Sequence, residues 1–315
     1  MRSYTKPYLP IADQIALLRS RGMTIEDEGK AEEYLRRIGY YRLSAYWHPM
    51  RVRDAASNKV LDDFVQGTTF KEVTDLYTFD GRLRLLALDA LERLEVSLRT
   101  EVALTLGKHD PCAHRETRFL DQKFTRAKGG KPSRHREWVQ RLDERATYAK
   151  DQFAEHFRKT YPNDDMPIWI AVELLDFGPL SHLIGGMRFS DRQQIGRGYG
   201  GVDANQLASW TRALSFTRNV CAHHSRLWNR PLVNQPALPK GKVPSELAHI
   251  ASVQGKATRF YAIASIMQFM LRCANPRTSW KDRFIAHIHT FPSSPRISLA
   301  AAGFHTGWES ESLWQ

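Results

Sequence analysis

The sequence predicts a mainly α-helical fold, a helical bundle with a small N-terminal module. Apolar residues recur at helical spacing through long segments without proline, and clusters of glycine and proline separate these segments. The chain has 315 residues, which is enough to bury a sizeable core. We expect the N-terminal module over 1–70, a helical domain over 71–290 and a C-terminal tail over 291–315 that packs on the bundle.

In the N-terminal module, helices are expected over 11–21 and 28–38, because each apolar segment is followed by a glycine, Gly22 or Gly39. The aromatic-rich segment after Gly39 alternates apolar and polar residues and reaches a turn at Asn58. This alternation favours a small β-hairpin, although the signal for it is weak.

The longest periodic segment extends from residue 72 to about residue 106 and predicts the central helix of the bundle. Gly81 lies inside it and marks a candidate break. Glu95 and Arg99 are four residues apart, so they can pair along the helix. They could also reach a functional site, but we interpret them as a structural ion pair.

Residues 122–136 (QKFTRAKGGKPSRHR) contain six lysines and arginines and no acidic residue. The Gly129-Gly130 pair and Pro132 predict a mobile basic loop outside the core. This loop either contacts RNA or is a solvated linker. Its candidate RNA-binding residues are Lys123, Arg126, Lys128, Lys131, Arg134 and Arg136.

Beyond this loop the sequence predicts further helices and one proline-rich loop, over 230–245. The helix at 168–187 is expected to be kinked or split near Gly178-Pro179. The other predicted helices are 136–161, the amphipathic helix described next, 247–273 and 280–289.

The amphipathic helix is expected over about 205–229, after a turn cluster that ends at the candidate N-cap Asp203. At about 100° per residue, its apolar residues fall in one stripe: Leu207, Trp210, Leu214, Cys221 and Trp228. The opposite face contains no carboxylate and consists of Arg212, Ser215, Asn219, His223 and Arg226, with Arg218 at its edge. A cationic helix face is ordinarily just solvated, which is the alternative interpretation.

The run RNVCAHHSRLWNR at 218–230 places three residues at the spacing Arg-Asn-x-x-x-His: Arg218, Asn219 and His223. RNA carries its own nucleophile, the 2′-hydroxyl beside the scissile phosphate, so a site that cuts it must move protons and stabilise negative charge. Histidine titrates near neutral pH, and arginine can bind two phosphate oxygens. The trio therefore predicts an RNA-cutting site in which His223 transfers protons and Arg218 stabilises the phosphate. Asn219 would hold the imidazole or a phosphate oxygen by hydrogen bonding. Arg212 and Arg226 are candidates for binding the RNA backbone.

The spacing alone is not specific. With 32 arginines and 12 histidines, about four matches of Arg followed by His four to six residues later are expected by chance. The sequence contains four, which are Arg218/His223, Arg218/His224, Arg42/His48 and Arg283/His289. For Arg42, stacking among its aromatic neighbours is the favoured interpretation. Only the helical context singles out the first pair.

Composition supports a polyanionic partner. Lysine plus arginine exceed aspartate plus glutamate by 46 − 34 = 12, the pI is about 9.7, and arginine outnumbers lysine 32 to 14. The three cysteines lack metal-binding or disulfide spacing, and the sequence has no Walker loop or Rossmann fingerprint, so no cofactor or metal is expected. There is no apolar leader and no long apolar run. These features predict a cytoplasmic protein with no membrane contact.

The motif resembles the signature of the Abi-like proteins (AbiD/AbiF type, abortive infection), which belong to the HEPN superfamily. Five further segments resemble the family in order: Lys6–Met23, Ile38–Trp47, Leu76–Thr100, Pro167–Leu183 and Ala301–Trp314. The resemblance implies an all-helical HEPN bundle with metal-independent endoribonuclease activity and a role in defence or toxin–antitoxin systems. It assigns catalysis to Arg218, Asn219 and His223.

HEPN domains typically pair, and this chain has one credible motif, so we expect a homodimer with a composite site. The resemblance also implies a structured noncoding RNA as a plausible regulator. Two alternatives remain. One is a non-cleaving RNA-binding HEPN module of a ribonucleoprotein, and the other is a helical bundle that binds only proteins.

Overall fold

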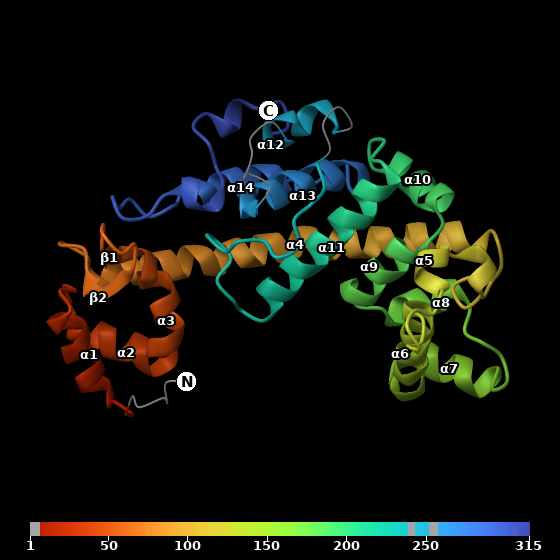
Figure 1. Cartoon of the computed structure of the whole chain (residues 1–315), viewed down its shortest axis with the longest axis horizontal. Coiled ribbons are helices and arrows are strands. Elements are labelled where there is room, and N and C mark those ends of the chain that lie inside the picture. Colours follow the sequence, from red (N-terminus) through yellow and green to blue (C-terminus); the bar gives the residue numbers. More distant parts are fainter. Residues whose placement is uncertain (1–6, 239–242, 252–257) are drawn as a thin grey trace.

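The computed structural model describes residues 7–238, 243–251 and 258–315, and its elements are arranged along one long helix (Figure 1). This helix, α4, comprises the 38 residues Phe70–Gly107 and is therefore about 57 Å long. It begins at a capping box, in which the Thr69 side chain accepts from the Glu72 backbone N–H and the Glu72 carboxylate accepts from the Thr69 backbone N–H. The prediction of a mainly helical fold is confirmed.

The candidate break at Gly81 is wrong, because α4 continues through it. A glycine inside a helix costs about 1 kcal/mol relative to alanine. Packing on several sides offsets this cost, since α4 contacts α3, α8, α9, α10, α11, α13 and α14.

The N-terminal module lies at one end of α4 (Figure 1). It consists of α1 (Ile11–Ser20), α2 (Glu28–Arg37), α3 (Tyr40–Trp47) and an antiparallel hairpin of β1 (Arg51–Arg53) and β2 (Val60–Phe64). The hairpin agrees with the prediction, but the aromatic segment before it is helical. Its buried residues Leu43, Tyr46 and Trp47 have helical spacing, i, i+3 and i+4, and this burial overrides the local alternation.

The opposite end of α4 is surrounded by shorter helices (Figure 1). These are α5 (Gln122–Thr125), α6 (Arg134–Tyr148), α7 (Gln152–Thr160), α8 (Ile168–Ala171), α9 (Phe177–Gly186) and α10 (Phe189–Gly198). The apolar segment splits before Phe177, close to the predicted place. The basic segment 122–136 is not wholly outside the core, because Phe124 of α5 is only 4% exposed.

The remaining elements complete the bundle. They are α11 (Ala204–Ala222), α12 (Ala248–Ala251), α13 (Phe260–Ala274) and α14 (Trp280–Ile288). Part of the helix predicted over 247–273 falls on 252–257, outside the described residues. In the C-terminal tail, Trp308 and Trp314 pack on the rings of Tyr261 and Phe284. No helix within the described ranges combines the length and the apolar composition needed to cross a bilayer.

Because of His114, which precedes α5, we expect the stability of the fold to decrease at acidic pH. Its side chain is fully buried, and this burial lowers its pKa to about 3. In the unfolded chain this histidine has its ordinary pKa near 6.5. At any pH between 6.5 and about 3, the unfolded chain therefore binds a proton at this side chain that the folded chain does not bind. The folded state is therefore favoured above about pH 6.5 and loses this stability as the pH falls. Between about pH 7 and pH 5, the free energy of unfolding should fall by about 2 kcal/mol from this group alone.

Urea unfolding of wild type and His114→Gln at these two pH values measures this contribution. The variant should lose the part of the pH dependence that His114 contributes, whereas His156→Gln, which replaces an exposed histidine on α7, should retain all of it. An unchanged pH dependence in His114→Gln would assign the acid sensitivity to other groups.

Candidate functional site

Helix α11 is anchored in the core by its apolar face. On the predicted polar face, Arg212 and Asn219 are exposed, whereas Ser215 is buried. Asp203 and Gln206 form a capping box at its start, as the candidate N-cap implied. The predicted apolar stripe is buried: Leu207, Trp210 and Leu214 are fully enclosed, and Cys221 nearly so. The helix packs against α9, α10 and α4. Burial also raises the pKa of the Cys221 thiol to about 12, so this cysteine is an unreactive core residue.

The helix ends at Ala222, and the prediction that it extends to residue 229 is wrong. His223 is the C-cap, and His224 has a left-handed backbone with φ of 55°. The N–H of Ser225 closes the turn by donating to the carbonyl of Val220 at 3.0 Å. The residues after His224 therefore leave the helix axis, and Arg226 does not continue the face of Asn219 and His223.

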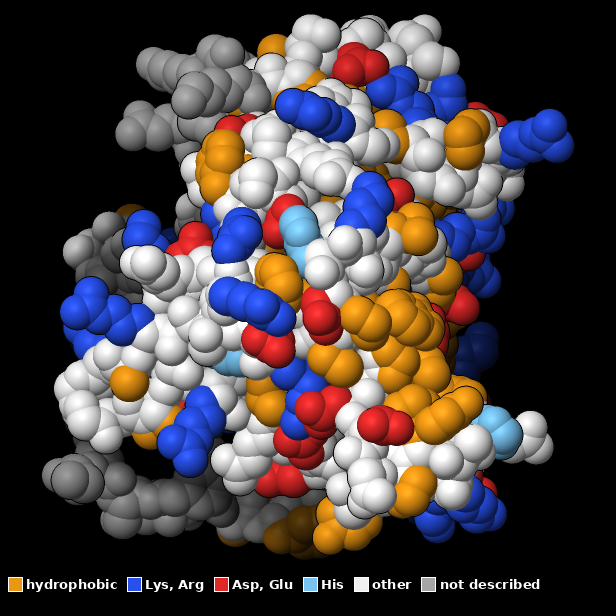
Figure 2. Space-filling view, turned by 90° about the vertical axis from the view of Figure 1, so that its right-hand side faces the viewer, with side chains coloured by type: hydrophobic (Ala, Val, Ile, Leu, Met, Phe, Trp, Pro, Cys, Tyr) orange, Lys and Arg blue, Asp and Glu red, His pale blue; other side chains and the backbone are white. Residues whose placement is uncertain are grey.

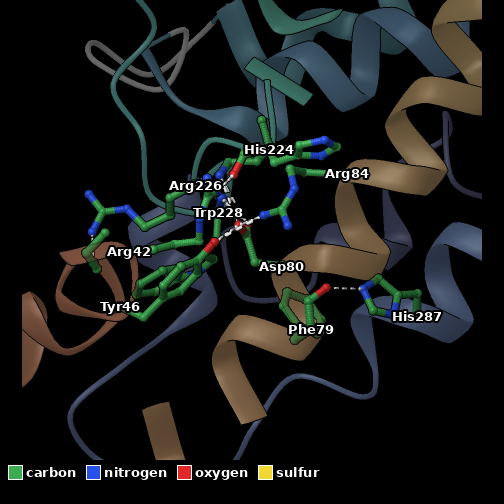
Figure 3. Close-up of polar contacts among 11 residues, drawn as sticks. Arg42, Tyr46, Phe79, Asp80, Arg84, His224, Arg226, Trp228 and His287 are labelled. Carbon is green, nitrogen blue, oxygen red and sulfur yellow. Dashed lines mark hydrogen bonds and ion pairs between the residues drawn. The ribbon is translucent and has the colours of Figure 1, made fainter. Parts of the chain in front are cut away.

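A buried carboxylate explains why the chain changes direction here (Figure 3). Asp80 on α4 is 0% exposed and accepts from the backbone N–H groups of Leu227 at 3.2 Å and Trp228 at 2.7 Å. It also accepts from the Tyr46 hydroxyl at 2.7 Å and the Arg84 guanidinium at 2.5 Å. Burial raises the pKa of Asp80, and the charge of Arg84 and these hydrogen bonds oppose that rise. We call these five residues the Asp80 cluster.

Two arginines join the same turn to α3 (Figure 3). Arg226 donates to the carbonyl of Ala45, and burial lowers its pKa. The predicted position of Arg226 beside His223 on an exposed helix face is therefore wrong. Arg42 donates to the carbonyl of His224 at 2.7 Å, an arrangement that the sequence did not predict. The Arg42/His48 spacing drew attention to this arginine but gave no indication of its partner.

The three motif residues differ in how far they are exposed. Asn219 and His223 are exposed and one turn apart, with the His223 N–H donating to the Asn219 carbonyl at 2.9 Å. Arg218 is half-buried. Among the described residues, no hydrogen bond joins the side chains of these three. Their exposure at the end of α11 leaves the imidazole and the amide accessible to a ligand.

Arg218 lies near a buried carboxylate of α4. Glu95 is largely buried, and burial raises its pKa, whereas the charges of Arg99 and Arg218 act to lower it. Glu95 pairs with Arg99 at 2.6 Å, so the predicted ion pair is present. The other interpretation was that Glu95 and Arg99 reach a functional site, and the charge of the motif residue Arg218 does act on Glu95.

Five of the candidate RNA-binding residues line one or both of two hollows in the surface. Arg212 of α11 and Arg134 of α6 line one recess, and Arg134 also lines a larger hollow of about 790 Å³ with Lys123, Arg126 and Lys128. Lys131 and Arg136 are exposed but line neither. At this end of the molecule, lysines and arginines are mixed with acidic and apolar groups and form no continuous basic surface (Figure 2).

In the described part of the chain, no three histidine, cysteine, aspartate or glutamate side chains are grouped so that they could hold a metal ion. The site therefore consists of guanidinium, amide and imidazole groups. These groups can bind an anion, orient it and transfer a proton.

Comparison with known proteins agrees with these features. A family profile described as Abi-like protein matches residues 33–229, which is more than half of the chain. The matched region includes α3, α4 and α11 and therefore contains both the motif and the Asp80 cluster. Searches of curated proteins and of solved structures gave no match. The chain thus belongs to the Abi-like family of abortive-infection-type proteins.

Proposed function

We propose that this protein is a metal-independent endoribonuclease of the HEPN type, acting in the cytoplasm in an abortive-infection or toxin–antitoxin system. The observation that supports this function is the exposure of Asn219 and His223 together at the C-terminal end of α11, with Arg218 next to them. Family membership supports the biological role. The three groups match what RNA cleavage requires.

In the proposed reaction, the 2′-oxygen attacks the neighbouring phosphorus, and the bond from phosphorus to the 5′-oxygen breaks. A base takes the proton of the 2′-hydroxyl, and an acid gives one to the departing 5′-oxygen. His223 serves as one of these groups. Arg218 binds the phosphate oxygens, where negative charge increases in the transition state, and Asn219 orients the imidazole or the phosphate. The products carry a 2′,3′-cyclic phosphate and a 5′-hydroxyl.

One imidazole does not supply both the acid and the base at the same moment. We therefore propose a twofold-symmetric dimer in which the two copies of His223 face each other across the RNA strand. The exposed position of His223 at a helix end is compatible with this arrangement. Such a nuclease would damage its own cell if it were always active, so we include a regulator, with a structured noncoding RNA as the proposed class.

The test is cleavage of end-labelled single-stranded RNA by purified protein in excess EDTA. We expect fragments that end in 2′,3′-cyclic phosphate and no cleavage of the all-deoxy strand, which lacks the nucleophile. Sedimentation of the same preparation should show a dimer. RNA that is bound but never cut would support the non-cleaving RNA-binding module instead. No binding even at low salt, where phosphate contacts are strongest, would leave only the protein-binding bundle.

A further inference from the structure

A recess of about 290 Å³ lies between α6, α9 and α11, outside the motif itself. Trp138 of α6 forms part of its wall and is fixed there, because its indole N–H donates to the carbonyl of Pro179 on α9 at 2.9 Å. Phe124 of α5 is also in the wall and is buried. Part of the wall of the recess is thus formed by side chains that the core holds in place.

Three guanidinium groups and one imidazole, from three helices, line this recess. Arg134 and Arg141 come from α6, Arg212 comes from α11, and His182 comes from α9. The three guanidinium groups are close enough to His182 to act together with burial in lowering its pKa. One carboxylate, Glu137, also lines the recess. Three positive charges less one negative charge leave two positive charges, without counting His182.

Several other arginines have carboxylate partners, such as Asp143 for Arg115 and Asp176 for Arg145. In the described ranges, Arg141 and Arg212 form no ion pair or hydrogen bond with any side chain, and Arg134 donates only to a backbone carbonyl. These three arginines outnumber the one carboxylate of the recess, and such an excess of like charge favours binding of an anion. Arginine matches phosphate in particular, because its planar fork donates two parallel hydrogen bonds.

The recess also lies on a path to the motif. Arg212 and Asn219 are seven residues apart on α11, nearly two full turns, so both lie on one face about 10 Å apart along the axis. On its other side, the recess shares Arg134 with the basic hollow of residues 122–134. A strand whose scissile phosphate lies at His223 would thus bring a second phosphate near Arg212.

We propose that this recess is a phosphate-binding subsite, formed by Arg134, Arg141, Arg212 and His182, that holds a non-scissile phosphate of the RNA strand. The proposal rests on the proposed function for the identity of the strand, whereas phosphate binding itself requires only the recess. Arg141 and His182 are the members that no motif in the sequence indicated.

The test measures binding of a labelled single-stranded oligoribonucleotide in the His223→Ala background, so that cleavage does not interfere. Adding Arg141→Ala and Arg212→Ala should weaken binding by about tenfold or more at low salt, because the bound phosphate loses its charged hydrogen bonds to these guanidinium groups. The slope of log affinity against log salt should become less steep by about 0.7, the value for one single-strand phosphate contact. Arg141→Lys and Arg212→Lys together should weaken binding less, because they keep the charges but lose the fork.

The matched control is Arg277→Ala, which removes an exposed arginine between α13 and α14 and should leave affinity unchanged. Thermal unfolding shows whether each variant is folded. If the double alanine variant binds RNA as tightly as the control, the subsite is refuted and the nuclease proposal is unaffected. If it binds RNA weakly but the wild type never cuts RNA, the subsite stands and the nuclease proposal fails.

Discussion

Replacing Asp80 with alanine should lower the free energy of unfolding by about 3–5 kcal/mol, the usual cost of removing one partner of a buried ion pair. The substitution leaves the Arg84 guanidinium buried without its carboxylate, and it removes the acceptor for the Leu227 and Trp228 N–H groups and the Tyr46 hydroxyl. Unsatisfied buried donors are costly because they have lost their water. Urea unfolding at neutral pH measures the change.

Two companion variants make this result interpretable. Tyr46→Phe removes the hydroxyl that donates to Asp80 and accepts from Arg84, and it should cost about 1–3 kcal/mol while the buried ion pair remains. Asp63→Ala, at an exposed position on β2, should change stability by less than about 0.5 kcal/mol. If Asp80→Ala costs no more than Asp63→Ala, the Asp80 cluster does not hold the turn after α11.

The second large effect is expected for His223→Ala, which should slow RNA cleavage by about 10²–10⁴-fold, the range that general acid–base catalysis contributes. RNA affinity should change little, because the arginines remain. The fold should also be unaffected, since His223 is exposed at the helix end. Single-turnover cleavage measures the rate, and fluorescence anisotropy measures the affinity.

The neighbouring exposed histidine provides the matched comparison. His224 is also at a permitted spacing from Arg218, but its left-handed backbone directs it differently from His223. We expect His224→Ala to retain most of the activity. If His224→Ala abolishes cleavage and His223→Ala does not, the nuclease proposal survives with the wrong imidazole assigned. If both variants cut RNA as the wild type does, neither histidine is catalytic.

The sequence predicted those parts of the site that depend on local periodicity. The buried stripe of Leu207, Trp210 and Leu214 follows from the helical repeat, and so does the exposure of Asn219 on the opposite face. The start of α11 was also predictable, because Asp203 is a typical N-cap residue.

The end of α11 was not predictable, because its cause is not local. No proline or glycine interrupts the segment after Ala222, so periodicity alone extends the helix. The turn is fixed by Asp80, which is almost 150 positions earlier in the chain and accepts the N–H groups of Leu227 and Trp228. Arg226 was misplaced for the same reason, since its acceptor, Ala45, belongs to α3. The recess at Arg141 likewise depends on how α6 and α9 pack.

The ties between α3 and the turn after His224 mean that the boundary at residue 70 does not separate independent units. A shortened chain that began at residue 71 would lose Tyr46, Ala45 and Arg42, and with them three of the contacts that shape the turn after α11. Asp80 of α4 would lose the hydrogen bond from Tyr46 and would be exposed where α3 had covered it. The smallest self-sufficient piece of this protein must therefore retain α3, and the family match, which begins at residue 33, includes it.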